Sequence, residues 1–532
     1  MISEISHHNQ ENTTSYPVLS VIMIAFALSF VACSDIFVEN AYTRTIKHYS
    51  SPDDSLKQRA AQFLSEYAGY HYGIPRYLID ADGNRVTHMQ PYQFSSDTVY
   101  RHYLDSLGYH FHADEPIRDL DAITPEYLIN NIELAFAAWQ NPWAKDVSFD
   151  DFCRYILPYR NATEDLSDWR HVFKLRYEQL INDSTNHSTD LRTVVRFMMR
   201  QLGRDMQYGT QLRDFYQNFL TPQQSEMMYT MGCQGLAHYA TLALRACGIP
   251  CAMIDIGWRF TDVNHSSVLF PAVGTNDSVF RVSIHDSWQE MPQAKDSMAS
   301  WRTMRYSYEV NPDLLEIQND PETVPGYGNP VTRIDVTAQM SATRTLTLSI
   351  PAEYRERKHL YLCRFKNWRW IPIREGKVRG DSVVFLNTTI RQWYRLASMD
   401  GEKTIPFGGT FTLHGDGSIY PYDGNGDTVM FKMVYGCQPN ETRLRRQVTT
   451  YYWGAQNDWN ALTQEAILWG LNKETGEYRV FDESMRNDFT PVFHLLTVYL
   501  PCRTVFFDNE TPRPLGYIAT DPETGEGYFQ QY

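Results

Sequence analysis

The segment MGCQGLAHYATLALRACGIPC, from Met231 to Cys251, limits the possible folds more than any other part of the chain. From Gln234 to Ala246 it has helical character and is apolar on nearly every side, so a helix formed here has to be buried. Gly248 suits the left-handed position after a helix, and Pro250 prevents the helix from continuing. We therefore expect a buried helix that begins next to Cys233 and ends before Gly248.

Cys233 stands where this helix begins, directly after Gly232. A thiol at a helix N-terminus faces the positive end of the helix dipole, which lowers the thiol pKa and favours the reactive thiolate. The backbone N–H groups of the first turn could also bind a developing oxyanion. A single cysteine in an apolar helix is, however, more often a small packing residue. Cys233 is therefore a candidate nucleophile, and the packing role stays open.

A nucleophilic thiol needs a base, and His265 and Asp286 lie on neighbouring strand-like segments, HSSVLFPAV and VFRVSIHDSW. If Val273 pairs with Ser278 across a four-residue loop, His265 lies directly opposite Asp286. A tighter turn at Asn276-Asp277 leaves Asp286 diagonal to His265 but on the same face of the sheet. Either register lets the carboxylate orient the imidazole, which is the third role in a Cys-His-Asp arrangement.

The N-terminal segment predicts export. Residues 17–32, PVLSVIMIAFALSFVA, are apolar and uncharged, and the run ends in FVAC at Cys33. This is short for a membrane span and typical of the apolar part of a signal peptide. FVAC resembles a bacterial lipobox, so we expect residues 1–33 to be a signal peptide and Cys33 to be lipidated, with the protein anchored in the bacterial cell envelope, at the periplasmic face or cell surface. An uncleaved N-terminal anchor and a buried helix are the alternatives.

The remaining cysteines predict neither a disulfide scaffold nor a metal site. Seven of the eight remain after Cys33, and an odd number leaves at least one free thiol. Cys247 and Cys251 lack a second Cys/His pair at zinc spacing, so we expect both to be buried thiols. The sequence DGNGD at residues 423–427 lacks the later glycine and glutamate of a calcium loop and predicts a hairpin turn. We expect no metal and no cofactor.

Charge and composition narrow the choice of partner. The net charge of −15 comes without a basic stripe, which excludes a nucleic-acid partner because phosphate binding needs clustered Lys and Arg. The 35 tyrosines and 12 tryptophans fit packed sheets, or surfaces that contact sugars or peptides.

Periodicity divides the chain into regions and predicts an α+β fold. Residues 34–190 form helical patterns, and residues 191–320 carry the buried helix followed by short strands. A Pro/Gly-rich linker at 321–330 leads to a β-sandwich at 331–412 and a second β-rich domain at 413–532.

The stretches GCQGLAHYATLALRACGIPCAMIDIG, NHSSVLFP and VFRVSIHDS together resemble the transglutaminase-like superfamily. This resemblance implies a papain-like core with a helical region before it and antiparallel β-sandwich domains behind it, as in bacterial lipoproteins. It also implies that Cys233 attacks a peptide or amide carbonyl, that His265 protonates the leaving amine and that Asp286 holds His265. The thioester would be released by water, as in a peptidase or amidase, or by an amine, as in cross-linking; hydrolysis is the expectation we favour. The substrate would be a peptide, a protein or a peptidoglycan-type molecule.

Two other classes of function stay open. Many members of the superfamily have Trp two residues after the histidine, where this chain has Ser267. A surface lipoprotein that has lost catalysis and binds glycan or protein through its β domains would fit that difference. An envelope cross-linking component is the third possibility.

Overall fold

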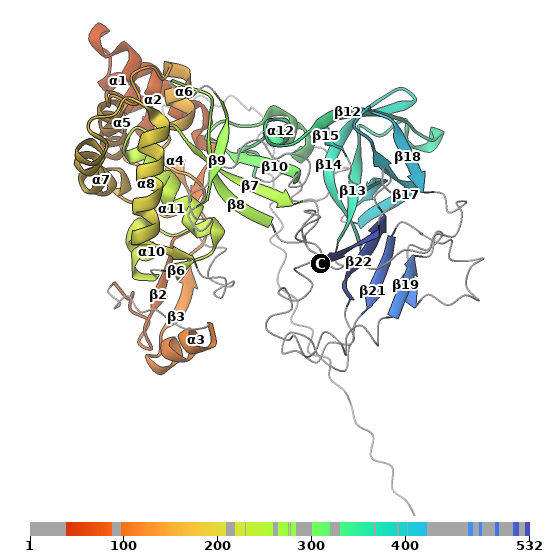
Figure 1. Ribbon diagram of the computed structural model, residues 1–532. Coiled ribbons are helices and arrows are strands. Elements are labelled where there is room, and N and C mark those ends of the chain that lie inside the picture. The colour runs from red at the N-terminus through yellow and green to blue at the C-terminus, as the bar shows by residue number, and fades with distance from the viewer. Residues whose placement is uncertain are drawn as a thin grey trace, which may run out of the picture. The chain divides into compact units, whose positions relative to one another are not determined.

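Helix α11 spans Cys233–Ala246, as the apolar segment predicts (Figure 1). Every residue from Gly235 to Ala246 is buried, as an all-round apolar helix requires. The helix packs most extensively against α5 (Pro125–Trp139), α7 (Trp169–Thr185), β7 (Ala252–Trp258) and β8 (Asn264–Phe270).

The computed structural model describes residues 39–87, 97–208, 219–228, 230–258, 264–274, 276, 278–283, 300–319, 330–366, 369–390, 393–401 and 403–422, and the strand segments β19 to β23. Residues 40–532 form one unit and residues 1–39 another. The predicted signal segment with Cys33, Asp286, residues 321–329 of the linker and the DGNGD turn lie outside the described residues. None of the helices described is long and apolar enough to cross a membrane.

The region before α11 is largely helical, as predicted. Helix α5 begins as the sequence indicates, with the Thr124 side chain accepting a hydrogen bond from the Tyr127 N–H and Pro125 in the first turn. The other longer helices are α1 (Ala41–His48), α2 (Ser55–Tyr67), α3 (Asp97–Ser106) and α8 (Leu191–Asp205), and the shorter ones are α4 (Asp119–Ala122), α6 (Phe149–Tyr155) and α10 (Pro222–Met228). Three two-stranded sheets join β1 (Tyr72–Gly73) to β4 (Ile117–Arg118), β2 (Arg76–Ile79) to β3 (His110–Ala113) and β5 (Gln207–Tyr208) to β6 (Thr230–Met231).

The strands that follow α11 form a five-stranded antiparallel sheet in the order β11-β10-β7-β8-β9. Its further members are β9 (Phe280–Val282), β10 (Ser300–Tyr306) and β11 (Arg333–Asp335). Side chains alternate between its two faces. One face, with Met253 and Val268, joins α11 in the main core, while the other face, with Ile254 and Leu269, packs against Val336 and Met340.

The register of β8 on β9 differs from both registers expected. Val268 pairs with Val282, whereas the expected registers pair Val268 with Ser283 or His285. In the observed register odd-numbered residues of β8 pair with odd-numbered residues of β9, whereas both expected registers paired odd with even numbers. Both expected registers, which placed His265 and Asp286 on one face, were therefore wrong. The loop after β8 determines this register, and its turn residues permit several lengths.

Beyond residue 330 the chain forms antiparallel sheets, which together with the helices before them confirm the α+β class. The segment TRIDVTAQM, expected as a sandwich strand, instead forms β11 in the core sheet and then helix α13 (Thr337–Met340). Helix α12 (Pro312–Gln318) precedes it. A seven-stranded sheet follows in the order β12 (Thr343–Ser349), β15 (Ser382–Thr389), β14 (Arg369–Arg379), β13 (His359–Lys366), β16 (Trp393–Asp400), β17 (Lys403–Leu413) and β18 (Ile419–Tyr422). The last sheet has the order β20 (Tyr478–Val480), β19 (Ile467–Leu471), β21 (Leu495–Tyr499), β22 (Pro514–Thr520) and β23 (Gly527–Gln531).

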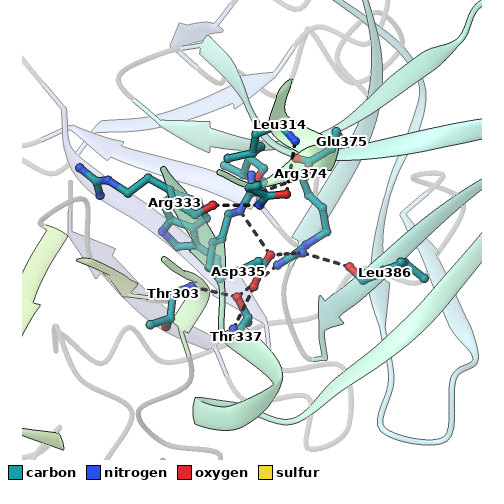
Figure 2. A network of polar contacts seen from close by, with 12 residues as sticks. Thr303, Leu314, Arg333, Asp335, Thr337, Arg374, Glu375 and Leu386 are labelled. Atoms are coloured by element: carbon teal, nitrogen blue, oxygen red, sulfur yellow. Dashed lines mark hydrogen bonds and ion pairs between the residues drawn. The ribbon is translucent and has the colours of Figure 1, made fainter. Parts of the chain in front are cut away.

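A network of charged side chains connects β11 to β14 (Figure 2). Asp335 Oδ2 accepts a hydrogen bond from Arg374 Nη1 at 2.7 Å and lies 3.4 Å from Arg302 Nε. Arg302 Nη2 also donates to Glu375 Oε1 at 3.0 Å, and the Thr337 N–H donates to Asp335 Oδ1 at 2.9 Å. Burial raises the pKa of Asp335, but the two arginines and Thr337 lower it more, so the pKa lies below its usual range.

The end of α11 depends on a left-handed glycine. Gly248 has φ +74°, its N–H donates to the Arg245 carbonyl, and the Ile249 N–H donates to the Leu244 carbonyl, which is the hydrogen-bond pattern of a Schellman motif. A Cβ at residue 248 would overlap the carbonyl oxygen of Ala138 in α5. Gly248 is therefore needed both for its backbone conformation and for the close approach of α5.

Gly248→Ala should destabilise the protein by more than about 3 kcal/mol, because left-handed strain and overpacking add. Gly380→Ala is the matched control: φ there is +64° but nothing lies within 4 Å of the added Cβ, so we expect a cost of about 1 kcal/mol. Urea unfolding of both variants measures the difference. Equal costs would show that the contact with Ala138 does not matter.

Asp335→Asn should lower the free energy of unfolding by about 3 kcal/mol at neutral pH, because it leaves the buried Arg374 without its carboxylate and removes one of the two carboxylates beside Arg302. The pKa of Asp335 is lowered by folding, so its stabilisation is fully present above the usual aspartate pKa and is lost as pH falls through the lower folded value. Unfolding curves of both proteins should therefore converge in acid. Lys377→Gln, which removes exposed ion pairs, should cost less than about 1 kcal/mol, and a gap that persists in acid would contradict the assignment.

Candidate active site

Cys233 occupies the first position of α11, and its thiol meets a helix end that no side chain caps. The N-cap residue is Gly232, in an extended conformation with φ −71° and ψ 174°, and glycine has no side chain to bond the first-turn N–H groups. Cys233 itself is half-buried, whereas the next turns of the helix are fully buried. This is the position in which the sequence places a candidate nucleophile.

The surroundings of the thiol act on its pKa in opposite directions. Burial, the strongest influence, raises the pKa of Cys233, and the negative charge of Asp255 raises it further. The backbone N–H groups of Ser266, Gln234 and Cys233 lower it. The net pKa lies above the usual value for a thiol, so the resting residue is a protonated thiol at neutral pH.

A carboxylate lies on the same face of the sheet as α11. Asp255 in β7 pairs directly with Ser266 in β8, and its Oδ1 accepts a hydrogen bond from Ser266 Oγ at 2.7 Å. Its Oδ2 accepts hydrogen bonds from Tyr306 Oη at 2.9 Å and from Arg333 Nη1 at 2.7 Å. The Gln234 side chain, next to Cys233 in sequence, donates to Tyr306 Oη at 3.4 Å.

His265 points to the other face of β8. It pairs with Ile256 of β7, one residue away from the Asp255–Ser266 pair, and alternation therefore places its side chain on the face opposite Asp255. Its Nε2 lies 3.0 Å from Ser283 Oγ. No hydrogen bond joins the Cys233 thiol to the His265 imidazole, both of which belong to the described part of the chain.

The hydroxyl groups beside His265 determine which ring nitrogen carries the proton. Ser267 Oγ donates its single proton to the Val282 carbonyl at 3.0 Å, so in its 3.0 Å contact with Ser283 Oγ it has to accept. Ser283 thus donates to Ser267 and accepts from His265 Nε2–H. Neutral His265 is therefore the Nε2–H tautomer, with Nδ1 as its acceptor nitrogen.

The structure brings together only part of the predicted site. It places Cys233 at the start of the helix, as expected, and it shows no hydrogen bond between the thiol and the His265 imidazole among the described residues. Sequence reasoning missed the residues that lie on the thiol's face of the sheet: Asp255, Ser266, Tyr306 and Arg333. The signal for Asp255 was present, because it is a lone charge within the apolar run AMIDIG.

The other described cysteines are packing residues. Cys247 and Cys251 are fully buried, as predicted, and so is Cys363, while Cys153 is 4% exposed. Burial raises the pKa of Cys153 and of Cys251 to about 12, so neither ionises at neutral pH. Among the described residues no group of three or more His, Cys, Asp or Glu side chains is placed to hold a metal ion.

Buried arginines connect the helix that carries Cys233 to its neighbours. Arg245, in the RACGIP end of α11, donates from Nε to the Cys251 carbonyl at 3.3 Å, which links the helix to the start of β7. Arg170 of α7 donates to the Arg245 carbonyl at 3.1 Å and to Asn131 Oδ1 at 2.9 Å. Each buried guanidinium thus satisfies main-chain carbonyl groups that would otherwise be unpaired.

No family model and no curated protein matches the chain. Among solved structures, the chain is similar to a "putative protease" from Parabacteroides distasonis ATCC 8503, with 11% sequence identity and a TM-score of 0.14. The match covers 64% of this chain and 65% of that chain. A TM-score this low does not indicate a shared fold.

The tautomer of His265 is testable by nitrogen NMR on protein labelled in its histidines. We expect the neutral ring to be protonated at Nε2, and Ser283→Ala to weaken that preference because the acceptor is removed. Ser382→Ala, which removes a hydroxyl that donates to the Arg379 carbonyl, should leave the His265 signals unchanged. A ring protonated at Nδ1 in the native protein would contradict the hydrogen-bond order derived above.

Proposed function

We propose that this chain is an exported, transglutaminase-like cysteine enzyme that attacks a peptide or amide carbonyl through Cys233, with hydrolysis favoured over transamidation. The observation that carries the proposal is the position of the thiol at the uncapped N-terminus of a buried helix, among the N–H groups of Cys233, Gln234 and Ser266. These donors favour a thiolate, and they could also stabilise the oxyanion of a tetrahedral intermediate.

In the proposed reaction the Cys233 sulfur forms a bond to the carbonyl carbon, and the thiol proton passes through His265 to the leaving amine as the C–N bond breaks. The resulting thioester reacts with water, which releases a carboxylic acid and restores the thiol. Asp286 stays the sequence-based proposal for a residue that orients His265.

The resting arrangement sets a condition on this mechanism. The imidazole lies on the face of β8 away from Asp255 and is bonded to Ser283, so catalysis requires β8 and its neighbour to rearrange when substrate binds. The neutral thiol fits such a resting state, because a base has not yet reached it.

The position of His265 on the other face of β8 favours a second candidate function. If His265 stays on its face of β8, it cannot act as the base of Cys233, and the chain is a catalytically degenerate surface lipoprotein that binds glycan or protein through its β domains. Ser267, where many members of the superfamily have Trp, is buried and supports Ser283 rather than a substrate. For both candidates we propose a lipid anchor at Cys33 and a place in the bacterial cell envelope.

The two candidates differ in how the reactivity of Cys233 depends on His265. In an enzyme, His265→Ala should slow acylation of Cys233 by p-nitrophenyl acetate at neutral pH by about ten-fold or more, because the thiol loses the base that has to reach it when substrate binds. His112→Ala, which changes an exposed histidine, should leave the rate unchanged. Mass spectrometry of timed samples gives the rate at each cysteine.

Fast labelling of Cys233 alone does not decide between the candidates, since Cys153, Cys247, Cys251 and Cys363 are buried and react slowly in either case. Equal acylation rates in the native protein and in His265→Ala would contradict the enzyme and support the binding protein.

A further inference from the structure

The face of the core sheet that packs on α11 carries a partly buried ion pair that the proposed reaction does not use. Asp255 and Arg333 meet at 2.7 Å, with side chains 27% and 17% exposed. Asp255 is the lone charge of an otherwise apolar strand segment, and burying a charge there is costly unless a partner compensates it. Arg333 supplies that compensation.

Arg333 comes from a distant part of the chain. It lies in β11, after the linker at 321–330, and pairs with Tyr306 at the end of β10. Its guanidinium lies 3.3 Å from the centroid of the Tyr306 ring, so the aromatic face fixes the group that bonds Asp255. Two residues further along the same strand, Asp335 bonds Arg374 of the seven-stranded sheet (Figure 2). The Asp255–Arg333 pair therefore depends on strand β11, which the bond between Asp335 and Arg374 connects to β14.

Two short connections lead from this pair to Cys233. Ser266 bonds Asp255 through Oγ at 2.7 Å, and its N–H acts on the thiol. Gln234, the residue after Cys233, bonds Tyr306 Oη, which in turn donates to Asp255. The charge of Asp255 therefore acts on the sulfur both directly and through the two residues that border it.

We propose that Asp255 and Arg333 are positioning residues that set the reactivity of Cys233, with the charge of Asp255 disfavouring the thiolate and Arg333 limiting that effect. This inference rests on the proposed function, in which Cys233 is the nucleophile. The charged and titratable groups near this end of α11 include Asp255 of β7, Tyr306 of β10 and Arg333 of β11, which bond one another. Burial and Asp255 hold the pKa of Tyr306 far above neutral, so the two oppositely charged side chains carry the effect.

The charge that each substitution removes determines the direction in which the reactive pH of Cys233 shifts. A carboxylate near the sulfur disfavours the thiolate, so Asp255→Asn lowers the pH at which Cys233 becomes reactive. A guanidinium near the carboxylate opposes that effect, so Arg333→Gln raises the same pH. Damage to the fold would move both variants in the same direction, whereas a charge effect moves them in opposite directions.

The test is the pH profile of Cys233 alkylation by iodoacetamide, read by mass spectrometry on the full chain. We expect the midpoint to fall by about half a pH unit or more in Asp255→Asn and to rise by about as much in Arg333→Gln, which is about a three-fold change in rate below the midpoint. Arg333→Lys keeps the charge and should restore most of the native midpoint. Arg118→Gln, which removes an exposed ion pair with Asp121, should not move it.

Shifts of both variants in one direction, or no shift in Asp255→Asn, would overturn the proposal. Asp255→Asn keeps the size of the side chain, so it decides the matter even if Arg333→Gln does not fold. The alkylation profile reports the ionisation of Cys233 whether or not the protein has turnover. If the two variants shift the midpoint in opposite directions but acylation of Cys233 does not depend on His265, the enzyme is rejected and this inference is kept. If acylation depends on His265 but the midpoints do not shift in opposite directions, only this inference is rejected.

Discussion

The burial of α11 is the constraint on which the other features of the core depend. A helix that is apolar all round has to be enclosed by other elements, and here helices α5 and α7 and strands β7 and β8 make the most extensive contacts with it. Its end is fixed by Gly248, which lets α5 approach, and by Arg245, which bonds the start of β7. Since β7 begins directly after this helix end, the position of α11 also decides which strand residues face the thiol.

This local constraint explains what the sequence could predict. Helix α11, the buried cysteines at its end, the cap of α5 at Thr124 and the α+β class all follow from patterns within one segment, and the structure confirms them. The position of Cys233 at the start of the helix also follows from such a local pattern. Each of these features is determined by residues close together in the chain.

Features that join distant segments could not be predicted in the same way. The register of β9 on β8 depends on a loop with several possible turns, and a shift of one residue exchanges the faces of the sheet. The partner of Asp255 comes from β11, beyond a linker, in a segment expected to belong to a different domain. His265 is the clearest case, because its identity suits a base while the strand alternation turns it away from Cys233.

The central claim, that Cys233 becomes acylated with the help of His265, is tested most directly by trapping the acyl intermediate. After exposure to p-nitrophenyl acetate and an acid quench, peptide mass spectrometry should find an acetyl thioester on Cys233, formed together with a burst of p-nitrophenol. The same treatment of folded His265→Ala should give little of this thioester. Acylation that is absent from the native protein, or equal in both proteins, would contradict the account.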